Sequence, residues 1–150
     1  MPIRCEIVSQ DRTLFQGDVD MVIAPGTEGE MGILPHHAPL LTTLDFGILR
    51  VRTGEREEAF AISGGFMEVR PEVVTVLADV GENVAEIDEA RAEAARRQAE
   101  ELLAKGPPPE TDEYLALEAA LRRSTLRLEA VRRYRRGAPH RPRIEGIEDR

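Results

Sequence analysis

Two adjacent histidines, His36 and His37, are the residues in this sequence whose types best suit metal chemistry. A zinc site needs three or four ligands that converge from one side. Neighbouring residues of an extended chain point in opposite directions, and the third histidine, His140, lies far away in the sequence. The pattern therefore disfavours a metal site, and we expect no metal.

The surrounding segment, "GEMGILPHHAPLL" over residues 29–41, has the composition of a loop that contacts a partner. Pro35 and Pro39 stiffen it, and Gly29 and Gly32 permit unusual backbone angles. Its Leu, Ile and Met side chains are too many for a short chain to bury completely. We expect the exposed remainder to form a partner surface.

Motifs for catalysis are scarce. The glycines of "GTEGEMG" do not have the G-x-G-x-x-G spacing, and no Walker loop is present. Ser63 in "ISGGF" lies beside two glycines but not in a G-x-S-x-G motif, and we interpret Gly64 and Gly65 as a tight turn between two strands. The sequence therefore predicts a non-catalytic protein.

Charge divides the chain of 150 residues, whose net charge is −8, into two parts. Residues 1–85 carry 14 acidic and 6 basic side chains, whereas residues 86–150 carry 14 of each, with nine arginines between Arg122 and Arg143. Such a split predicts two modules with different partners.

A single cysteine, Cys5, excludes an internal disulfide. No apolar run approaches the ~18 to 20 residues of a membrane span, and the N-terminus lacks a signal-peptide pattern, so we expect a cytoplasmic location.

The first module, residues 1–85, is expected to be an all-β sandwich or barrel. Short segments of alternating hydrophobicity follow one another at intervals of about 8 to 12 residues, with Gly or Pro between them. In the first of these, "IRCEIV", Ile3, Cys5 and Ile7 share one face.

The second module, residues 86–136, is expected to be an antiparallel hairpin of two helices. The first helix is predicted over 86–105, ended by Gly106 and three prolines, and Thr111 is the predicted N-cap of the second. Thin apolar stripes at heptad spacing run along both helices. These stripes are Ala92, Ala95, Ala99 and Leu102 in the first helix, and Leu117, Leu121, Ser124, Leu128 and Val131 in the second. Residues 137–150 have no apolar period, so we expect a disordered tail.

Two long segments resemble a known family. "EGEMGILPHHAPLLTTL", residues 28–44, is similar to the "SGELGILPGHAPLL" signature of the epsilon subunit of the F-type ATP synthase. "AISGGFMEVRPEVVTVLAD", residues 61–79, resembles the second strong segment of that family, and "IDEARAEAA" resembles the start of its first C-terminal helix. The similarity covers about residues 1–133. It implies a ten-stranded β-sandwich followed by a two-helix hairpin.

The resemblance also implies a function: a non-catalytic rotor subunit in the central stalk, peripheral on the cytoplasmic face of the bacterial membrane. The sandwich would bind the gamma subunit and the ring of c subunits. The hairpin would lie folded on the sandwich, or extend along gamma into the alpha/beta catalytic head and inhibit ATP hydrolysis. By position, the candidates for the c-ring contact are Glu30, Met31, Leu34 and His37. His36 stands where the family usually has glycine.

The resemblance further assigns roles to the hairpin. Some bacterial members bind ATP, which is a regulatory ligand there and not a required cofactor, through an Ile/Leu-Asp-x-x-Arg-Ala motif and arginines of the second helix. The matching residues are Ile87, Asp88, Arg91, Ala92, Arg123 and Arg127. The alternative is that these charges are solvated and bind nothing. Arg122, Arg123, Arg127, Arg132 and Arg133 are the candidates for an inhibitory contact with an acidic segment of the catalytic beta subunits.

Two other functions compete with this hypothesis. One is an interaction module whose basic helical arm binds nucleic acid, which we rank below the rotor because an acidic sandwich repels a phosphate backbone. The other is a small metal-dependent enzyme built on His36 and His37. Copurification with gamma, salt-sensitive DNA binding and stoichiometric zinc distinguish the three hypotheses.

Overall fold

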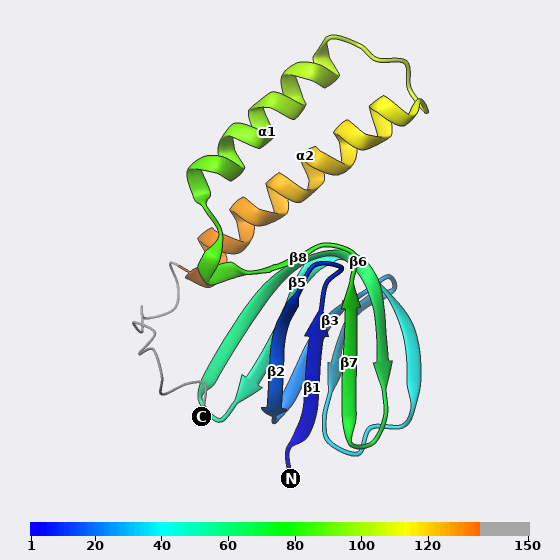
Figure 1. Cartoon of the computed structure of the whole chain (residues 1–150), viewed down its shortest axis with the longest axis vertical. Helices are drawn as coiled ribbons and strands as arrows, with labels where there is room; N and C mark the ends of the chain where they lie inside the picture. Colours follow the sequence, from blue (N-terminus) through cyan, green and yellow to red (C-terminus); the bar gives the residue numbers. More distant parts are fainter. Residues whose placement is uncertain (136–150) are drawn as a thin grey trace.

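Residues 1–135 are described by the computed structural model of the protein, and they form a β-sandwich followed by two helices (Figure 1). The predicted tail, residues 137–150, and the last residue of the predicted hairpin lie outside the described residues. The described part contains eight strands: β1 (Ile3–Val8), β2 (Thr13–Val19), β3 (Met21–Gly26), β4 (Gly29–Ile33), β5 (Leu40–Thr53), β6 (Arg56–Val69), β7 (Val73–Ala78) and β8 (Gly81–Asn83). Their order is β2-β1-β7-β6-β5-β3-β4, with β8 beside β6.

The two layers are made by bends in β5 and β6, the longest strands at 14 residues each. Pairing between them is interrupted at Asp45 and Gly64. On one side of the interruption β6 pairs with β7, and β7 pairs with β1. On the other side β6 pairs with β8, and β5 pairs with β3. The sheet therefore folds over itself, and the sandwich is confirmed.

The prediction of a tight turn at Gly64 and Gly65 is wrong, because β6 continues through both residues. Both have positive φ angles, 83° and 135°, which glycine adopts without strain. A Cβ on Gly65 would lie 2.2 Å from the carbonyl oxygen of Leu77 in β7. The glycines thus allow a strand to bend between layers while its backbone stays close to its neighbour. The continuity of β5 and β6 is also why this chain has eight strands in its described residues where the resemblance implied ten.

The sandwich core lies between the layers. Ile3, Cys5 and Ile7 are fully buried on one face of β1, as the alternation predicted. They pack in one cluster with side chains from the other strands, including Phe60 and Met67 of β6. Burial raises the pKa of the Cys5 thiol to about 12. Cys5 is therefore a buried hydrophobic side chain and not a reactive thiolate at neutral pH.

The helices follow a short 3-10 turn, η1 (Val84–Glu86), and are α1 (Glu89–Ala104) and α2 (Asp112–Ala130), extended by the π-helical η2 (Val131–Arg135). The first helix begins later than predicted because the Asp88 side chain accepts a 3.0 Å hydrogen bond from the backbone of Arg91 and so acts as N-cap. Thr111 caps α2 as predicted, with a 3.2 Å bond from Tyr114. The two helices form a hairpin, which confirms the second part of the predicted fold (Figure 1).

One of the two predicted stripes is in the wrong register. Ala92 and Ala99 are buried, but Ala95 is exposed and Leu102 is 37% exposed. Arg96, which follows Ala95, and Leu103, which follows Leu102, are half-buried instead. The stripe of α2 is as predicted, with Ser124, Leu128 and Val131 all buried.

Candidate functional site

The base of the helical hairpin packs against β5 and β6 of the sandwich, which makes this contact the first candidate site (Figure 1). A small apolar cluster, called the docking cluster below, joins the two modules. It consists of Ala59, Ala61, Val84, Ile87, Ala130 and Val131. Three of its six members are alanines, so little apolar area is buried and docking is weak compared with the sandwich core. The hairpin therefore has the kind of interface that can open without unfolding the sandwich.

Two arginines of α2 reinforce the docking cluster. Arg127 makes a forked ion pair with Glu82 of β8, in which Nε donates to one carboxylate oxygen and Nη2 donates to the other over 3.3 Å. Arg122 donates to Asp45 Oδ1 over 3.0 Å, and its guanidinium lies 4.3 Å from the centre of the Phe46 ring. The sequence did not indicate Asp45, Phe46 or Glu82, because pairs separated by 45 or 77 residues leave no local pattern.

Arg50 links β5 to three other parts of the chain. It donates to Glu30 of β4 over 3.2 Å, lies 3.7 Å from Glu57 of β6, and lies 5.7 Å from the centre of the Tyr134 ring in η2. Its side chain is only 16% exposed, and its Nε has no hydrogen-bond partner among the described residues. Glu30, a candidate for the c-ring contact, is therefore already held by an internal cation.

The candidate residues for ATP binding are divided between buried and accessible positions. Ile87 belongs to the docking cluster and Ala92 is fully buried, so neither side chain faces solvent. Asp88 uses one carboxylate oxygen as the N-cap of α1, and Arg91 is exposed. The hairpin brings this end of α1 beside the end of α2. There Arg123 is half-buried, while Arg127 is paired with Glu82.

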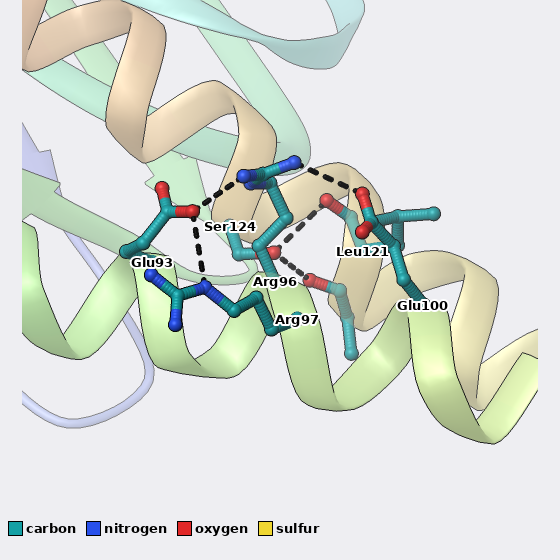
Figure 2. A network of polar contacts seen from close by, with 7 residues as sticks. Glu93, Arg96, Arg97, Glu100, Leu121 and Ser124 are labelled. Atoms are coloured by element: carbon teal, nitrogen blue, oxygen red, sulfur yellow. Dashed lines mark hydrogen bonds and ion pairs between the residues drawn. The ribbon is translucent and has the colours of Figure 1, made fainter.

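Charged side chains of α1 form ion pairs with one another where this helix faces α2 (Figure 2). Arg96 lies between Glu93 and Glu100, donating to Glu100 over 3.0 Å, and Arg97 pairs with Glu93 at 3.5 Å. The hydrogen bond from Arg96 and its positive charge hold the pKa of Glu93 below its usual value, and the same bond raises the pKa of Arg96. Ser124 is buried beside this network and donates to the carbonyl groups of its own helix (Figure 2).

This network explains the shifted stripe of α1. The stem of Arg96 covers the interface between the helices while its guanidinium reaches carboxylates at the rim. The opposite charges are spaced at i, i+3 and i, i+4, so they stabilise α1 locally and are not aimed at a ligand.

The four candidates for the c-ring contact lie along β4 and in the loop that follows it. Glu30 and Met31 lie near the start of β4, where Met31 packs partly against the sandwich core. Leu34 and His37 lie beyond the other end of β4, in the loop that leads to β5. Leu34 is 56% exposed, and the backbone amide of His36 fastens this loop to Pro71 with a 3.0 Å hydrogen bond.

An exposed apolar patch lies on the outer face of the layer that contains β7; the sequence indicated only Leu41 of it, as part of the apolar segment 29–41. Phe66 of β6 is directly opposite Leu77 of β7, and the two are 50% and 54% exposed. Leu41 of β5 lies diagonally across from Phe66 and is 70% exposed. The docking cluster uses the outer face of the other layer, so this patch stays uncovered by the described chain.

Neither a metal site nor a membrane span is found within residues 1–135. No group of three or more His, Cys, Asp or Glu side chains in this part of the chain could hold a metal ion. No helix there is long and apolar enough to cross a membrane. Arg132 and Arg133, the remaining candidates for an inhibitory contact, are exposed in η2.

Comparison with known proteins gives the same family for both modules. Residues 2–84 match the beta-sandwich domain of the ATP synthase Delta/Epsilon chain, and residues 85–132 match its long alpha-helix domain. The ATP synthase epsilon chain of Pelotomaculum thermopropionicum is 56% identical over 102 residues, covering 68% of this chain and 76% of the relative. That of Herpetosiphon aurantiacus is 49% identical over 132 residues, covering 88% of this chain and 96% of the relative.

Solved structures agree. A chain in the mitochondrial ATP synthase of Euglena gracilis, solved as an OSCP/F1/c-ring assembly, is 31% identical with a TM-score of 0.71, covering 87% of this chain and 81% of that one. A chain from the central stalk and c-ring of the Tetrahymena thermophila enzyme has a TM-score of 0.57 at 16% identity, which shows the shared fold. The matches to both modules and the identities over most of the chain confirm the resemblance seen in the sequence: the chain belongs to the epsilon subunit family of the F-type ATP synthase.

Proposed function

We propose that this chain is a non-catalytic rotor subunit of the central stalk, which joins the catalytic head to the c ring from the cytoplasmic face of the bacterial membrane. Its relatives are ATP synthase epsilon chains, and its structural neighbours come from assemblies that contain the c ring. The observation that carries the proposal is the exposed apolar patch of Leu41, Phe66 and Leu77. A patch of this kind on a charged protein indicates a protein partner.

We assign the patch to the gamma subunit. The test is copurification of gamma with the Phe66→Asp variant, which places a charge at the centre of the patch. Gamma should be lost from the complex while the variant stays folded. Leu102→Asp is the matched control, because Leu102 is also an exposed apolar side chain but lies on α1. Full retention of gamma by Phe66→Asp would contradict the assignment.

The contact with the c ring is assigned to the loop after β4, where Leu34 is exposed and His37 is half-buried. Glu30 joins the contact only if a polar group of the c ring competes with Arg50 for its carboxylate. Leu34→Asp should weaken attachment to the membrane sector without loss of gamma. A variant that loses gamma and c ring together would instead mean that the loop supports the gamma site.

The hairpin is assigned the inhibitory role. When it extends, Arg122, Arg123, Arg127, Arg132 and Arg133 would meet an acidic segment of the catalytic beta subunits. Truncation after Glu86 should then raise the rate of ATP hydrolysis by the reconstituted complex. An unchanged rate would contradict inhibition by the hairpin. A nucleic-acid role has less support, since Arg122 and Arg127 are already paired with carboxylates.

ATP is assigned as a regulatory ligand of the folded hairpin, through Asp88, Arg91, Arg123 and Arg127. A ligand that binds only the folded form stabilises it by about 2.7 kcal/mol at a hundredfold excess over Kd. Because Glu82 already holds Arg127, the ATP phosphates must compete with that carboxylate. Calorimetry should give a binding heat that Arg123→Ala and Arg127→Ala remove and that Arg132→Ala keeps. No heat at millimolar ATP would contradict the assignment.

A further inference from the structure

Asp45 lies at the point where β5 bends from one layer of the sandwich to the other. Asp45 has no partner residue in the pairing of β5 with β6. The pairs on either side of it are Leu44 with Gly65 and Phe46 with Ser63. Its Oδ1 accepts a 2.8 Å hydrogen bond from the backbone amide of Phe46. The bend therefore fixes this carboxylate beside the Phe46 ring before any helix docks.

Arg122 of α2 contacts both the Asp45 carboxylate and the Phe46 ring. Its guanidinium donates to the oriented Asp45 oxygen over 3.0 Å and stands 4.3 Å from the centre of the Phe46 ring. Carboxylate and ring offer the two contacts that a planar guanidinium combines best, an ion pair in its plane and a stack on its face. An adjacent cavity of about 380 Å³ is lined by Phe46, Arg122 and four further side chains of α2, so water reaches the pair.

The position of Arg122 along α2 makes this contact mechanically distinct from the docking cluster. Arg122 precedes Ala130 by about 12 Å along the helix axis, from the helical rise of 1.5 Å per residue. The docking cluster alone would be a single point about which the hairpin could pivot. The contact at Asp45 adds a second point and fixes the angle of the helices on the sandwich.

We propose that Asp45 and Phe46 form a latch for Arg122 that holds the hairpin in its folded, non-inhibitory position. The proposal rests on the assignment of an inhibitory role to the extended hairpin. Asp45 on the sandwich and the acidic segment of the beta subunits then compete for the same arginine, which cannot serve both at once. The side chains of Arg122 and Asp45 are 56% and 44% exposed, so the latch is weak and salt-sensitive.

The first test measures release of the hairpin in the isolated full chain. Ala130→Cys places a thiol in the docking cluster, where Ala130 is 1% exposed, and buried Cys5 contributes little background. Maleimide modification of this cysteine then reports how often the docking cluster opens. Asp45→Asn and Phe46→Leu should each raise the modification rate by roughly two- to fivefold at low salt, the range expected for losing an exposed ion pair or a cation–π contact.

Controls separate the latch from general effects of charge and stability. Asp18→Asn removes a carboxylate of the sandwich that lies 4.0 Å from Arg4, far from α2 in the fold, and should leave the rate unchanged. High salt should reduce the effect of Asp45→Asn because it screens the pair in the parent chain. Equal rates for the parent, Asp45→Asn and Phe46→Leu at low salt would overturn the latch.

The second test measures ATP hydrolysis by the reconstituted complex. Asp45→Asn frees Arg122 for the beta subunits and should strengthen inhibition, whereas Arg122→Gln opens the same latch but removes the inhibitory cation and should weaken it. Effects in the same direction would contradict competition for this arginine. If the modification rates rise as expected but truncation after Glu86 leaves hydrolysis unchanged, the latch stands and the proposed inhibitory function fails.

Discussion

His36 provides a test of what a strained backbone costs the sandwich. It has a φ angle of 65°, in the left-handed region that glycine adopts freely and other residues rarely do. Its side chain is exposed, and its backbone amide bonds to Pro71, a contact that any residue other than proline keeps. Replacement by glycine, the residue that the family resemblance implies there, should therefore stabilise the sandwich.

The size of the effect is the difference of two terms. A residue with a Cβ in the left-handed region costs about 1–2 kcal/mol, and His36→Gly removes that cost. Glycine also gives the unfolded chain more conformational freedom, which reduces the gain in stability by roughly 0.5–1 kcal/mol. The free energy of unfolding should therefore rise by up to about 1.5 kcal/mol, roughly 0.75 kcal/mol at the middle of both ranges. For a domain of this size that midpoint raises the melting temperature by about 3–6 °C.

Urea unfolding of the full chain, followed by circular dichroism, measures this change, and Gly54→Ala is the matched control. Gly54 has nearly the same φ angle, 62°, and a Cβ there would touch nothing within 4 Å. That substitution adds the strain that His36→Gly removes, so the two changes in stability should have opposite signs and similar sizes. A fall in stability for His36→Gly, or a rise for Gly54→Ala, would refute the argument from backbone strain.

Three further predictions concern the sandwich. Gly65→Ala should prevent stable folding, seen by circular dichroism, because its Cβ would lie 2.2 Å from the Leu77 carbonyl oxygen; a folded variant would mean that β7 can move aside. Met31→Asp should lower the melting temperature, since Met31 packs against the core, whereas His37→Asp should change it little; equal effects would show that both belong to the core or neither does. Cys5 has a pKa of about 12 when folded, against the usual 9.0 of a free thiol, so the folded state binds the extra proton. The free energy of unfolding should fall as the pH rises from about 9 to 12, and Cys5→Ala should remove part of that slope.

The sequence predicted those features of the hairpin that depend on residues close together in the chain. Thr111 is the N-cap of α2, and the stripe from Leu117 to Val131 faces inward. It failed on the register of α1, where alanines at several positions offer more than one stripe and the pattern cannot choose between Ala95 and a buried stem of Arg96. A narrow stripe of small residues thus predicts the presence of a helix better than its orientation.

Features that depend on contacts between distant strands could not be predicted in the same way. Gly64 and Gly65 mark an irregular backbone, but whether the chain reverses or bends there depends on the neighbouring β7. The sequence indicates the arginines of α2 as functional candidates, yet their partners Asp45 and Glu82 belong to the sandwich. No spacing rule connects residues that meet only after both modules have folded.

The way the two modules are packed gives a physical reason why one can move without the other. Every member of the sandwich core cluster lies between Ile3 and Ala78, so undocking the hairpin takes no side chain from that core. The docking cluster has six buried members, and the ion pairs beside it are partly exposed. Because exposed pairs contribute little and are weakened by salt, the docked and undocked forms differ by a small free energy. A ligand or partner that prefers one form by a few kcal/mol can therefore change which form predominates, while the sandwich and its apolar patch stay folded throughout.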